Sequence, residues 1–516
     1  MAGYERGTVV PVAELRRHAT DPAGLAAQRL GKGETAAAFF ALEVARTMQF
    51  AGEMLVRANA KATATRVVDL RTTMEISGGE ARCPEDAVQL CLRAGPELRV
   101  RGGADGPVAR QLAADRSARE QAARDRFWND FALLERRLAA FSEAQNVRSY
   151  RSIFHGRFVV PTAENAQLAL APDQAFVTYL VRDRVFAIVV TRKGTHQVTL
   201  PATPAELQEA SRKLRAALLC PTYDKGQRLR HCGANWQQAW RKHAQLLHKL
   251  AWAPLQTHIG AARSVYLAPD GPLAHVPFAV LEAPDGTLEL SRRRLTYLPS
   301  LSLLLSALNR ERKQGLPSML AIGDPEHDGA GTVRLPMAAA EAETVGGIFD
   351  GSATLQGKRA DEGAVRAALG SHNVLHFATH GLASRSDPLL SALLLATGQG
   401  DGLLTADEIR WFDLSHLHVA VLSACETAVA SDDGSGAGGL GSLVGSFLVA
   451  GAPSVIGSFW SVSDASTTLL MLRFYQAFLE VGASEALRQA QLALAQHPTF
   501  GHPYFWAAFS PWGIDG

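Results

Sequence analysis

The chain has few cysteines and almost no net charge. Its five cysteines among 516 residues are an odd number, widely scattered and without a C-x-x-C pair. That pattern argues against a disulfide framework and a zinc knuckle, so we expect a reducing compartment. Lys and Arg total 52 against 50 Asp and Glu, and no dense basic block stands out. This balance indicates neither nucleic acid nor an anionic membrane surface as a direct partner.

The N-terminal residues lack the apolar run of a secretory signal, and we expect a cytoplasmic protein. One stretch, residues 434–463, contains no charged residue and is long enough to raise the question of a membrane helix. Its many glycines and the Gly451-Ala452-Pro453 turn favour another interpretation. We expect a loop, a short buried helix, a turn and a buried strand, and no membrane span.

What is present is the composition of an ordinary globular protein, with 47% hydrophobic residues and a length typical of about three domains. The apolar pattern of residues 1–160 predicts a helical region. An apolar stripe over 34–60 includes Phe40 and Val44, and a second over 110–145 has heptad spacing. The second stripe fits either a coiled-coil partner or packing against the first helix. We find no convincing 34-residue repeat.

After about residue 165 the pattern becomes α/β. Two apolar runs, 176–181 and 185–190, flank a charged turn and predict a hairpin. Predicted helices follow at 204–218, at 234–258 and near 338–349, and further strands are expected to begin at Val265, Met319, Val374, Val419 and Ser454. Thr405 and Glu408 fit a helix capping box. Short apolar strands separated by helices predict a largely parallel sheet with helices on its faces and chemistry at its carboxyl edge.

Two of these strands run into chemically active residues. The strand from Val374 leads to His380, and the strand from Val419 leads to Cys425. If the strands are parallel neighbours, an imidazole faces a thiol at one edge of the sheet. The 45-residue separation leaves room for a crossover connection, as in caspases. A thiolate can act as the nucleophile and an imidazole as the acid and base, and this combination is suited to peptide hydrolysis.

The backbone amides of Gly381 and Cys425 are natural donors to the oxyanion of the tetrahedral intermediate. A structural interpretation exists for each residue alone: Cys425 as a small buried side chain and His380 as a hydrogen-bonded turn residue. Their matching strand-to-loop positions favour catalysis.

A metal site is not expected. His376 and His380 are four residues apart, but in a strand that spacing separates them by ~13 Å, and Phe377 stands where a zinc protease motif needs glutamate. We therefore interpret His376 as a structural histidine that could help to orient the site. The glycines of residues 434–445 lack the G-K-[ST] ending of a phosphate-binding loop. We expect no cofactor.

Trp460 and Asp464 follow another apolar run and could lie at the same edge. A carboxylate there would pair with a basic substrate side chain. Alternatively, Asp464 caps the helix that follows it.

The sequence resembles the CHAT family of caspase-like cysteine peptidases over residues 165 to 516. The central matches are His376-Phe-Ala-Thr-His380-Gly381 and Leu422-Ser-Ala-Cys425-Glu-Thr-Ala, and they are extended by Gly323-Asp-Pro325, Leu298-Pro-Ser300 and Trp460-Ser-Val-Ser-Asp464. The last stretch is similar to the acidic specificity pocket for arginine in separases.

The resemblance implies a caspase-like α/β fold with an inactive half at 165–310, a catalytic half at 311–516, and His380 and Cys425 as the catalytic pair. It also implies a cysteine endopeptidase that cleaves a partner protein in bacterial defence or programmed cell death, for example by activating a gasdermin-like effector. A regulatory protein or activator would bind the N-terminal helical region. The alternative is an interaction scaffold that no longer cleaves.

Overall fold

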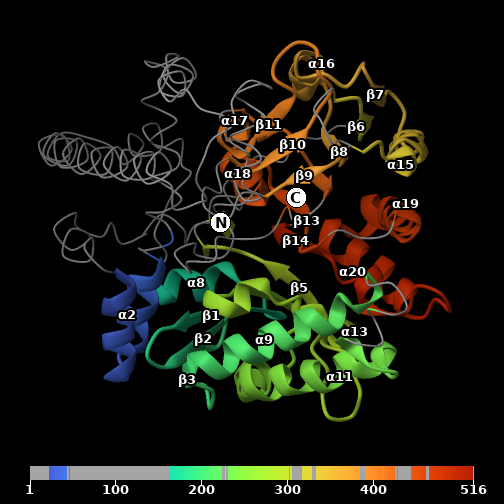
Figure 1. Cartoon of the computed structure of the whole chain (residues 1–516). Helices are drawn as coiled ribbons and strands as arrows, with labels where there is room; N and C mark the ends of the chain where they lie inside the picture. Colours follow the sequence, from blue (N-terminus) through green and yellow to red (C-terminus); the bar gives the residue numbers. More distant parts are fainter. Residues whose placement is uncertain are drawn as a thin grey trace, which may run out of the picture. The chain divides into compact units, whose positions relative to one another are not determined.

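The structure is a computed structural model of the whole chain (Figure 1). It describes residues 22–43, 46, 162–222, 227, 231–301, 303–304, 316–327, 333–383, 390–410, 412–424, 427, 443–460 and 464–514. The chain forms two compact units, of which the first comprises Met1–Ala169, Arg192–Thr195 and Ser300–Arg310 and the second the remainder. None of the helices within the described ranges combines the length and the apolar character needed to cross a bilayer.

Apart from Arg192–Thr195, which form a turn and the start of a strand, the described part of the first unit is mainly helical. It contains α2 (Pro22–Gly31), a helical segment at 35–43, and α8 (Ala163–Ala169). The helix expected from residue 34 is therefore seen at its start. There Phe39 is fully buried, whereas Phe40, which we expected in the apolar stripe, is half-buried. The rest of that helix and the stripe at 110–145 lie outside the described residues.

A buried carboxylate holds the described segments of the first unit together. Glu43 is fully buried, and its Oε2 accepts hydrogen bonds from Ser300 Oγ at 2.7 Å and from the Leu301 amide at 3.0 Å. Leu301 begins a helical segment, so the carboxylate satisfies an amide at a helix N-terminus.

The second unit is built on an 11-stranded sheet. Its strands are β1 (Gln174–Val181), β2 (Val185–Thr191), β3 (Gly194–Thr199), β4 (Ser264–Ala268), β5 (Arg294–Tyr297), β6 (Met319–Pro325), β7 (Ala353–Gly357), β8 (Val374–Ala378), β12 (Val419–Ser423), β13 (Ser454–Ser458) and β14 (Phe509–Gly513). Their order is β3-β2-β1-β4-β5-β14-β13-β12-β8-β6-β7. The pairs β1–β2 and β13–β14 are antiparallel, and the seven other neighbouring pairs from β1 to β7 in that order are parallel.

The predicted α/β class, a mostly parallel sheet flanked by helices, is confirmed. The hairpin is present, with Val181 paired to Val185, and strands occur at each of the five predicted starts to within one residue. β4, β8 and β13 are buried at every position. Burial on both faces is the reason that these strands are continuous apolar runs in the sequence.

The last strand joins the two ends of the sheet. β14 pairs in parallel with β5 and antiparallel with β13. At this join the ring of Tyr297 stacks on Trp512, with centroids 4.7 Å apart, and meets Phe459 edge-on at 5.7 Å. Strands from residues 165–310 thus occupy one end of the sheet, and β6, β7, β8, β12 and β13 occupy the other. The division into an inactive and a catalytic half stays a prediction.

Helices cover both faces of the sheet. The longer ones are α9 (Pro204–Leu218), α11 (Trp236–Leu247), α15 (Pro336–Gly346), α19 (Asp464–Val481) and α20 (Ala483–Ala495), and the shorter ones are α12 (Gln256–Ile259), α13 (Glu289–Arg292), α16 (Glu362–Ala368), α17 (Ala406–Ile409) and α18 (Leu443–Val449). These include the helices predicted at 204–218, 234–258 and 338–349. Thr405 caps α17 in the predicted capping box with Glu408.

Successive residues of β8 show which helices lie on which face. His376 contacts α15 and α19 through Glu341 and Tyr475, whereas the ring of Phe377 packs against Phe447 of α18 at 5.9 Å. Because neighbouring strand residues point to opposite faces, α15 and α19 cover one face and α18 the other.

A second, three-stranded antiparallel sheet follows β8 directly. It consists of β9 (Gly381–Leu382), β10 (Ala392–Leu394) and β11 (Leu403–Thr405), in the order β11-β10-β9. It begins at the residue after His380.

The uncharged stretch folds as predicted where it is described. All seven residues of α18 are buried, Gly451 adopts a φ of +105° in the turn, and β13 follows. A positive φ of this size is accessible mainly to glycine, which explains the turn at this position.

One pair of cysteines departs from expectation. Cys220, just after α9, and Cys232, before α11, form a disulfide with their Cα atoms 6.1 Å apart. The scattered cysteine spacing did not indicate this pair, because pairing depends on how the chain folds back. The cysteine pattern thus left this single disulfide unpredicted, and the reducing compartment and the cytoplasmic location stay predictions.

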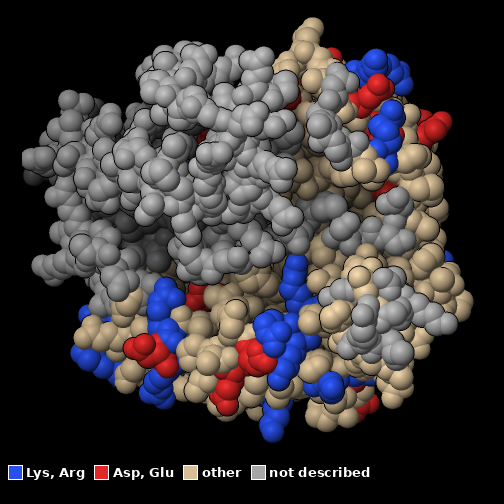
Figure 2. All heavy atoms as spheres, in the orientation of Figure 1, with Lys and Arg blue, Asp and Glu red and all other residues tan. Residues whose placement is uncertain are grey.

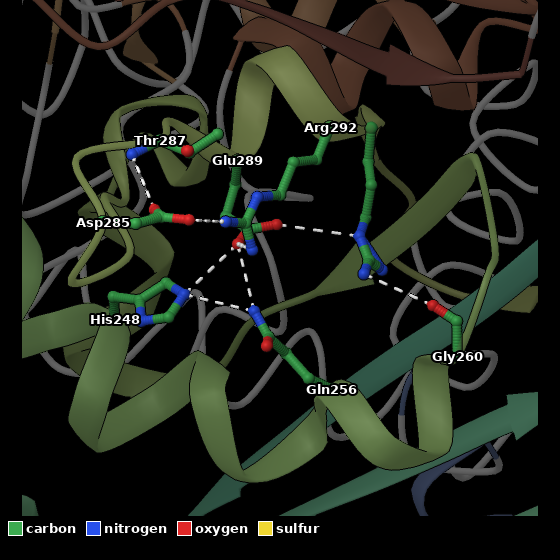
Figure 3. A network of polar contacts seen from close by, with 8 residues as sticks. His248, Gln256, Gly260, Asp285, Thr287, Glu289 and Arg292 are labelled. Atoms are coloured by element: carbon green, nitrogen blue, oxygen red, sulfur yellow. Dashed lines mark hydrogen bonds and ion pairs between the residues drawn. The ribbon is translucent and has the colours of Figure 1, made fainter.

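A buried polar cluster fastens α13 to the end of α11 (Figure 3). The carboxylate of Glu289 is fully buried and lies 3.2 Å from both His248 Nε2 and Gln256 Nε2. Arg292 of the same short helix pairs with Asp285 at 2.9 Å. These contacts compensate the burial of Glu289 and join elements that precede β5.

The exposed face of α9 carries charges of both signs. Glu209 accepts bidentate hydrogen bonds from Arg212, both 2.8 Å long, and lies 3.2 Å from Lys213. Hydrogen bonds to these two cations lower the pKa of Glu209 to about 2. Figure 2 shows blue and red side chains interspersed on the lower part of the molecule, where α9 and α11 lie in Figure 1.

Candidate active site

The two strands predicted to lead to the site are neighbours. β8 and β12 pair in parallel, with Ala378 opposite Ser423. His380 and Cys425 each follow this pair by two positions, so both chain segments leave the same carboxyl edge of the sheet. The predicted adjacency of the strands is confirmed. Cys425 itself lies outside the described residues.

The residues on either side of Cys425 are anchored to the next strand, β13. Ser458, its last residue, donates its hydroxyl proton to the carbonyl of Ala424, and its own amide donates to Thr427 Oγ1 at 2.8 Å. Thr427 is fully buried, and its carbonyl accepts a hydrogen bond from the Val444 amide at 3.3 Å. Ser458 therefore ties Ala424 and Thr427, on either side of Cys425, to the sheet edge. Sequence reasoning did not single out this serine or this threonine, whose role depends on strand order.

Two hydrogen bonds of His380 itself and one of the preceding Thr379 hold this histidine in place. Its Nε2 lies 2.6 Å from the carbonyl oxygen of Val333, and its own carbonyl accepts from the Leu394 amide at 2.9 Å. The preceding Thr379 donates its hydroxyl proton to the Leu394 carbonyl at 2.6 Å. The imidazole and the backbone of His380 are thus fixed from two directions.

The Val333 contact also selects the tautomer of His380. A carbonyl oxygen can only accept a hydrogen bond, so Nε2 carries the proton. In the neutral ring, Nδ1 then has a free lone pair that can accept a proton from a thiol. Val333 could not be found from the sequence, because every residue has a carbonyl group.

The amide of Gly381 remains outside the ladder of the small sheet. Gly381 is opposite Leu393, and the hydrogen bond from Leu394 N to His380 O makes this a non-hydrogen-bonded pair. The Gly381 N–H therefore points away from β10. β9 is an edge strand, so this donor faces outward from the sheet.

His376 is a structural histidine, as interpreted from the sequence. It is fully buried, with Nε2 3.0 Å from Glu341 Oε1 and Nδ1 3.1 Å from the Tyr475 hydroxyl. Both ring nitrogens are occupied by side chains of the protein, which leaves neither to a metal ion. The contact with Glu341 fastens α15 to β8, and α15 begins beside the segment that touches His380.

Trp460 lies two residues beyond β13, at the same edge of the sheet. Val421 of β12 pairs with both His376 and Ile456, so β8, β12 and β13 end in one row. The indole is buried and donates its N–H to the Tyr504 carbonyl at 3.1 Å. The adjacent Phe459 carbonyl accepts a hydrogen bond from Arg215 of α9 at 3.2 Å. Asp464 begins α19, and its side chain lies outside the described residues.

A glycine lets α15 approach the sheet closely beside the site. A Cβ added at Gly323 of β6 would lie 2.6 Å from Ala342 Cβ and 2.8 Å from the Ala338 carbonyl oxygen. We expect Gly323→Ala to push α15 outward and to destabilise the protein by about 1–3 kcal/mol, as overpacking usually does. Urea unfolding measures this, with Gly370→Ala as the control, because nothing lies within 4 Å of a Cβ at that position. Equal stability of the two variants would contradict the expectation.

The family model described as CHAT domain matches residues 241–514, more than half of the chain. The chain belongs to the CHAT domain family. The match spans β6, β8, β12 and β13, which lead to or border the candidate site residues of this CHAT protein, together with β4, β5 and β14.

Among curated proteins, the CHAT protein is similar to tetratricopeptide repeat protein 28. The human protein is 28% identical over 305 residues, which are 50% of this chain and 12% of that protein. The mouse protein is 27% identical over 313 residues, with the same two coverages. The chain thus spans about an eighth of the length of these relatives.

Solved structures show weaker similarity. The separase–securin complex of Saccharomyces cerevisiae matches with a TM-score of 0.46 and 11% identity over 68% of this chain and 31% of that chain. The complex of Porphyromonas gingivalis RgpB pro- and mature domains matches with a TM-score of 0.33 and 12% identity over 55% and 69%. Scores of this size say nothing about catalysis, and the chemistry of this chain is inferred from its own residues.

Proposed function

We propose that this CHAT protein is a cysteine endopeptidase that cleaves a partner protein with Cys425 as nucleophile and His380 as acid and base. The observation that supports this most strongly is the register of β8 and β12, in which the two residues follow one paired row by two positions each. The hydrogen bond between His380 Nε2 and the Val333 carbonyl also supports the proposal, because it favours the tautomer with a proton on Nε2 and leaves Nδ1 to accept the thiol proton.

In the proposed reaction His380 Nδ1 accepts the proton of the Cys425 thiol, and the thiolate attacks the peptide carbonyl carbon. The tetrahedral intermediate collapses as the imidazolium gives this proton to the leaving amine, and the substrate acyl group remains on sulfur as a thioester. Water then attacks the thioester while His380 accepts its proton, and the thiol and a carboxylic acid product are released. The Val333 carbonyl holds the ring in place throughout.

The amides of Gly381 and Cys425 are the proposed donors to the oxyanion. Support comes from Gly381, whose N–H is not used in the β9–β10 ladder and points outward from an edge strand. A donor that needs no rearrangement stabilises developing charge more effectively than water does.

For the substrate we propose a basic residue before the cleaved bond, bound by Asp464 with Trp460 as the buried wall behind it. Charge supports this preference. Residues 311–516 contain 21 Asp and Glu against 10 Lys and Arg, although the whole chain has a net charge of +2. An acidic half attracts a basic substrate and raises its rate of association.

The proposal includes a regulated protease in the cytoplasm, with an activator or regulatory subunit on residues 1–160. Its cellular role would be bacterial defence or programmed cell death, with a gasdermin-like effector as one possible target. These points come from the family resemblance and have their own test in the cleavage of a candidate partner protein.

The function is tested with the full chain and a peptide library whose members differ at the residue before the cut. We expect cleavage after Arg or Lys, identified by mass spectrometry, and its loss after treatment with a thiol-alkylating inhibitor. Cleavage that survives alkylation would overturn the cysteine mechanism. No cleavage of any peptide or of a native partner protein would favour the non-cleaving scaffold.

A further inference from the structure

The segment that touches His380 is itself held by an unusual aspartate. Asp324 lies near the end of β6, where the pairing with β7 shifts its register between Gly323 and Pro325. It has a φ of +44°, the only positive φ among the described residues other than glycine. Such backbone is costly for a residue with a side chain and persists where other contacts enforce it, often at functional sites.

The contacts of the Asp324 carboxylate all lead to the segment after Val333. Arg334 Nε lies 3.1 Å from each carboxylate oxygen and Nη2 lies 2.7 Å from Oδ2, while the Leu335 amide donates to Oδ1 at 2.6 Å. The carboxylate is nearly fully buried, whereas the Arg334 side chain is 53% exposed. The hydrogen bonds to Asp324 raise the pKa of Arg334 above its ordinary value.

We propose that Asp324 and Arg334 are positioning residues, which form a clamp that sets the place of the Val333 carbonyl and thereby the tautomer and orientation of His380. The Asp324 carboxylate binds the side chain of Arg334, the residue after Val333, and the backbone amide of Leu335. Val333, with 69% of its surface exposed, has no packing of its own that would hold its carbonyl in place. The bidentate pair fixes distance and angle together, which a single contact would not do. The clamp deepens the proposed function and rests on it for its effect on catalysis.

Several substitutions can break the clamp without disturbing the fold. Asparagine tolerates the left-handed backbone better than other residues with a side chain, so Asp324→Asn keeps the fold while it removes the charge. Arg334→Ala removes the other half of the clamp from a half-exposed site, and Arg334→Lys keeps the charge but not the fork of donors. Arg212→Ala is the matched control, since that arginine makes a bidentate pair with Glu209 on the outer face of α9.

In a peptide assay with the full chain, we expect Arg334→Ala and Asp324→Asn each to lower kcat by about 10- to 100-fold, the size expected when a reacting group moves by about 1 Å. KM stays within about twofold, Arg334→Lys has an intermediate kcat, and Arg212→Ala has the kcat of the wild type. Because both substitutions break one clamp, the double variant is no slower than the worse single variant. An unchanged kcat, a loss confined to KM, or additive losses would each overturn the proposal.

A second measurement does not depend on peptidase activity. Imidazole nitrogen resonances of the chain labelled with ¹⁵N-histidine, with His380 assigned by the His380→Gln variant, report which ring nitrogen carries the proton. We expect His380 of the wild type to be protonated at Nε2 and Arg334→Ala to populate both tautomers. If no peptide is cleaved but the tautomer responds to Arg334→Ala, the clamp stands and the peptidase function falls. If cleavage occurs and neither tautomer nor kcat responds, the function stands and the clamp falls.

Discussion

We expect alanine at Cys425 or at His380 to lower kcat/KM for a cleaved peptide by about 10³-fold or more and to leave the protein folded. Removing an acid–base group from a reaction of this kind costs about 10² to 10⁴ in rate, and a factor of 10³ corresponds to about 4 kcal/mol of transition-state stabilisation. Removing the sulfur also removes the covalent intermediate. Initial rates on a peptide cleaved by the wild type measure both losses.

The double variant separates a dyad from two independent contributions. Residues that act as one unit are not additive, so Cys425→Ala/His380→Ala should be no slower than the worse single variant. His196→Ala is a matched control, because His196 is exposed on β3 and stacks on another histidine, His258, away from β8 and β12. Cys91→Ala is the corresponding thiol control. Rates that fall equally for the controls, or losses that multiply in the double variant, would contradict the assignment.

The buried histidine beneath the site has the second large effect. Replacing His376 by leucine leaves the Glu341 carboxylate in the core without its partner 3.0 Å away. Removing the partner of a buried carboxylate usually destabilises a protein by about 3–5 kcal/mol, because the remaining charge is neither hydrated nor hydrogen-bonded. We expect a loss of this size in urea unfolding.

Two related variants test that reason. His376→Leu/Glu341→Leu removes both polar groups and should recover much of the stability, since a well-packed apolar pair replaces the hydrogen-bonded one. Tyr475→Phe removes only the hydroxyl at Nδ1 and should cost about 1 kcal/mol. Burial, and the nearby charge of Glu341, hold the pKa of Tyr475 well above its usual value, so this hydroxyl remains protonated and donates to Nδ1. A double variant less stable than His376→Leu would show that shape, not charge, dominates.

The strand that leads to the candidate histidine was predictable because it is buried on both faces. Val374–Ala378 and Val419–Ser423 are apolar runs with a chemically active residue two positions beyond each. Order along the sheet was not predictable to the same extent. β14, the last strand in the sequence, inserts between β5 and β13, and no local pattern records such a pairing between distant segments.

The residues that hold the candidate site residues in place were the hardest to predict from the sequence. Ser458 reaches both flanks of Cys425, and the Val333 carbonyl reaches His380 across 47 residues. Serine hydroxyls and backbone carbonyls are too common to mark a position in a sequence. The disulfide between Cys220 and Cys232 was missed for a similar reason, because the spacing of two cysteines does not reveal how the chain between them turns back.

Hydrophobic pattern was therefore enough for the α/β class, the hairpin and most helices, because burial restricts residue type locally, and the motifs make His380 and Cys425 the candidate pair. Which residues contact His380 and flank Cys425 in space could be seen only in the folded chain. Register brings β8 and β12 to one row, and the left-handed Asp324 directs its carboxylate to the segment beside His380. Such contacts join residues far apart in the chain, where the energy of each pair depends on distance and direction in space and not on position in the sequence.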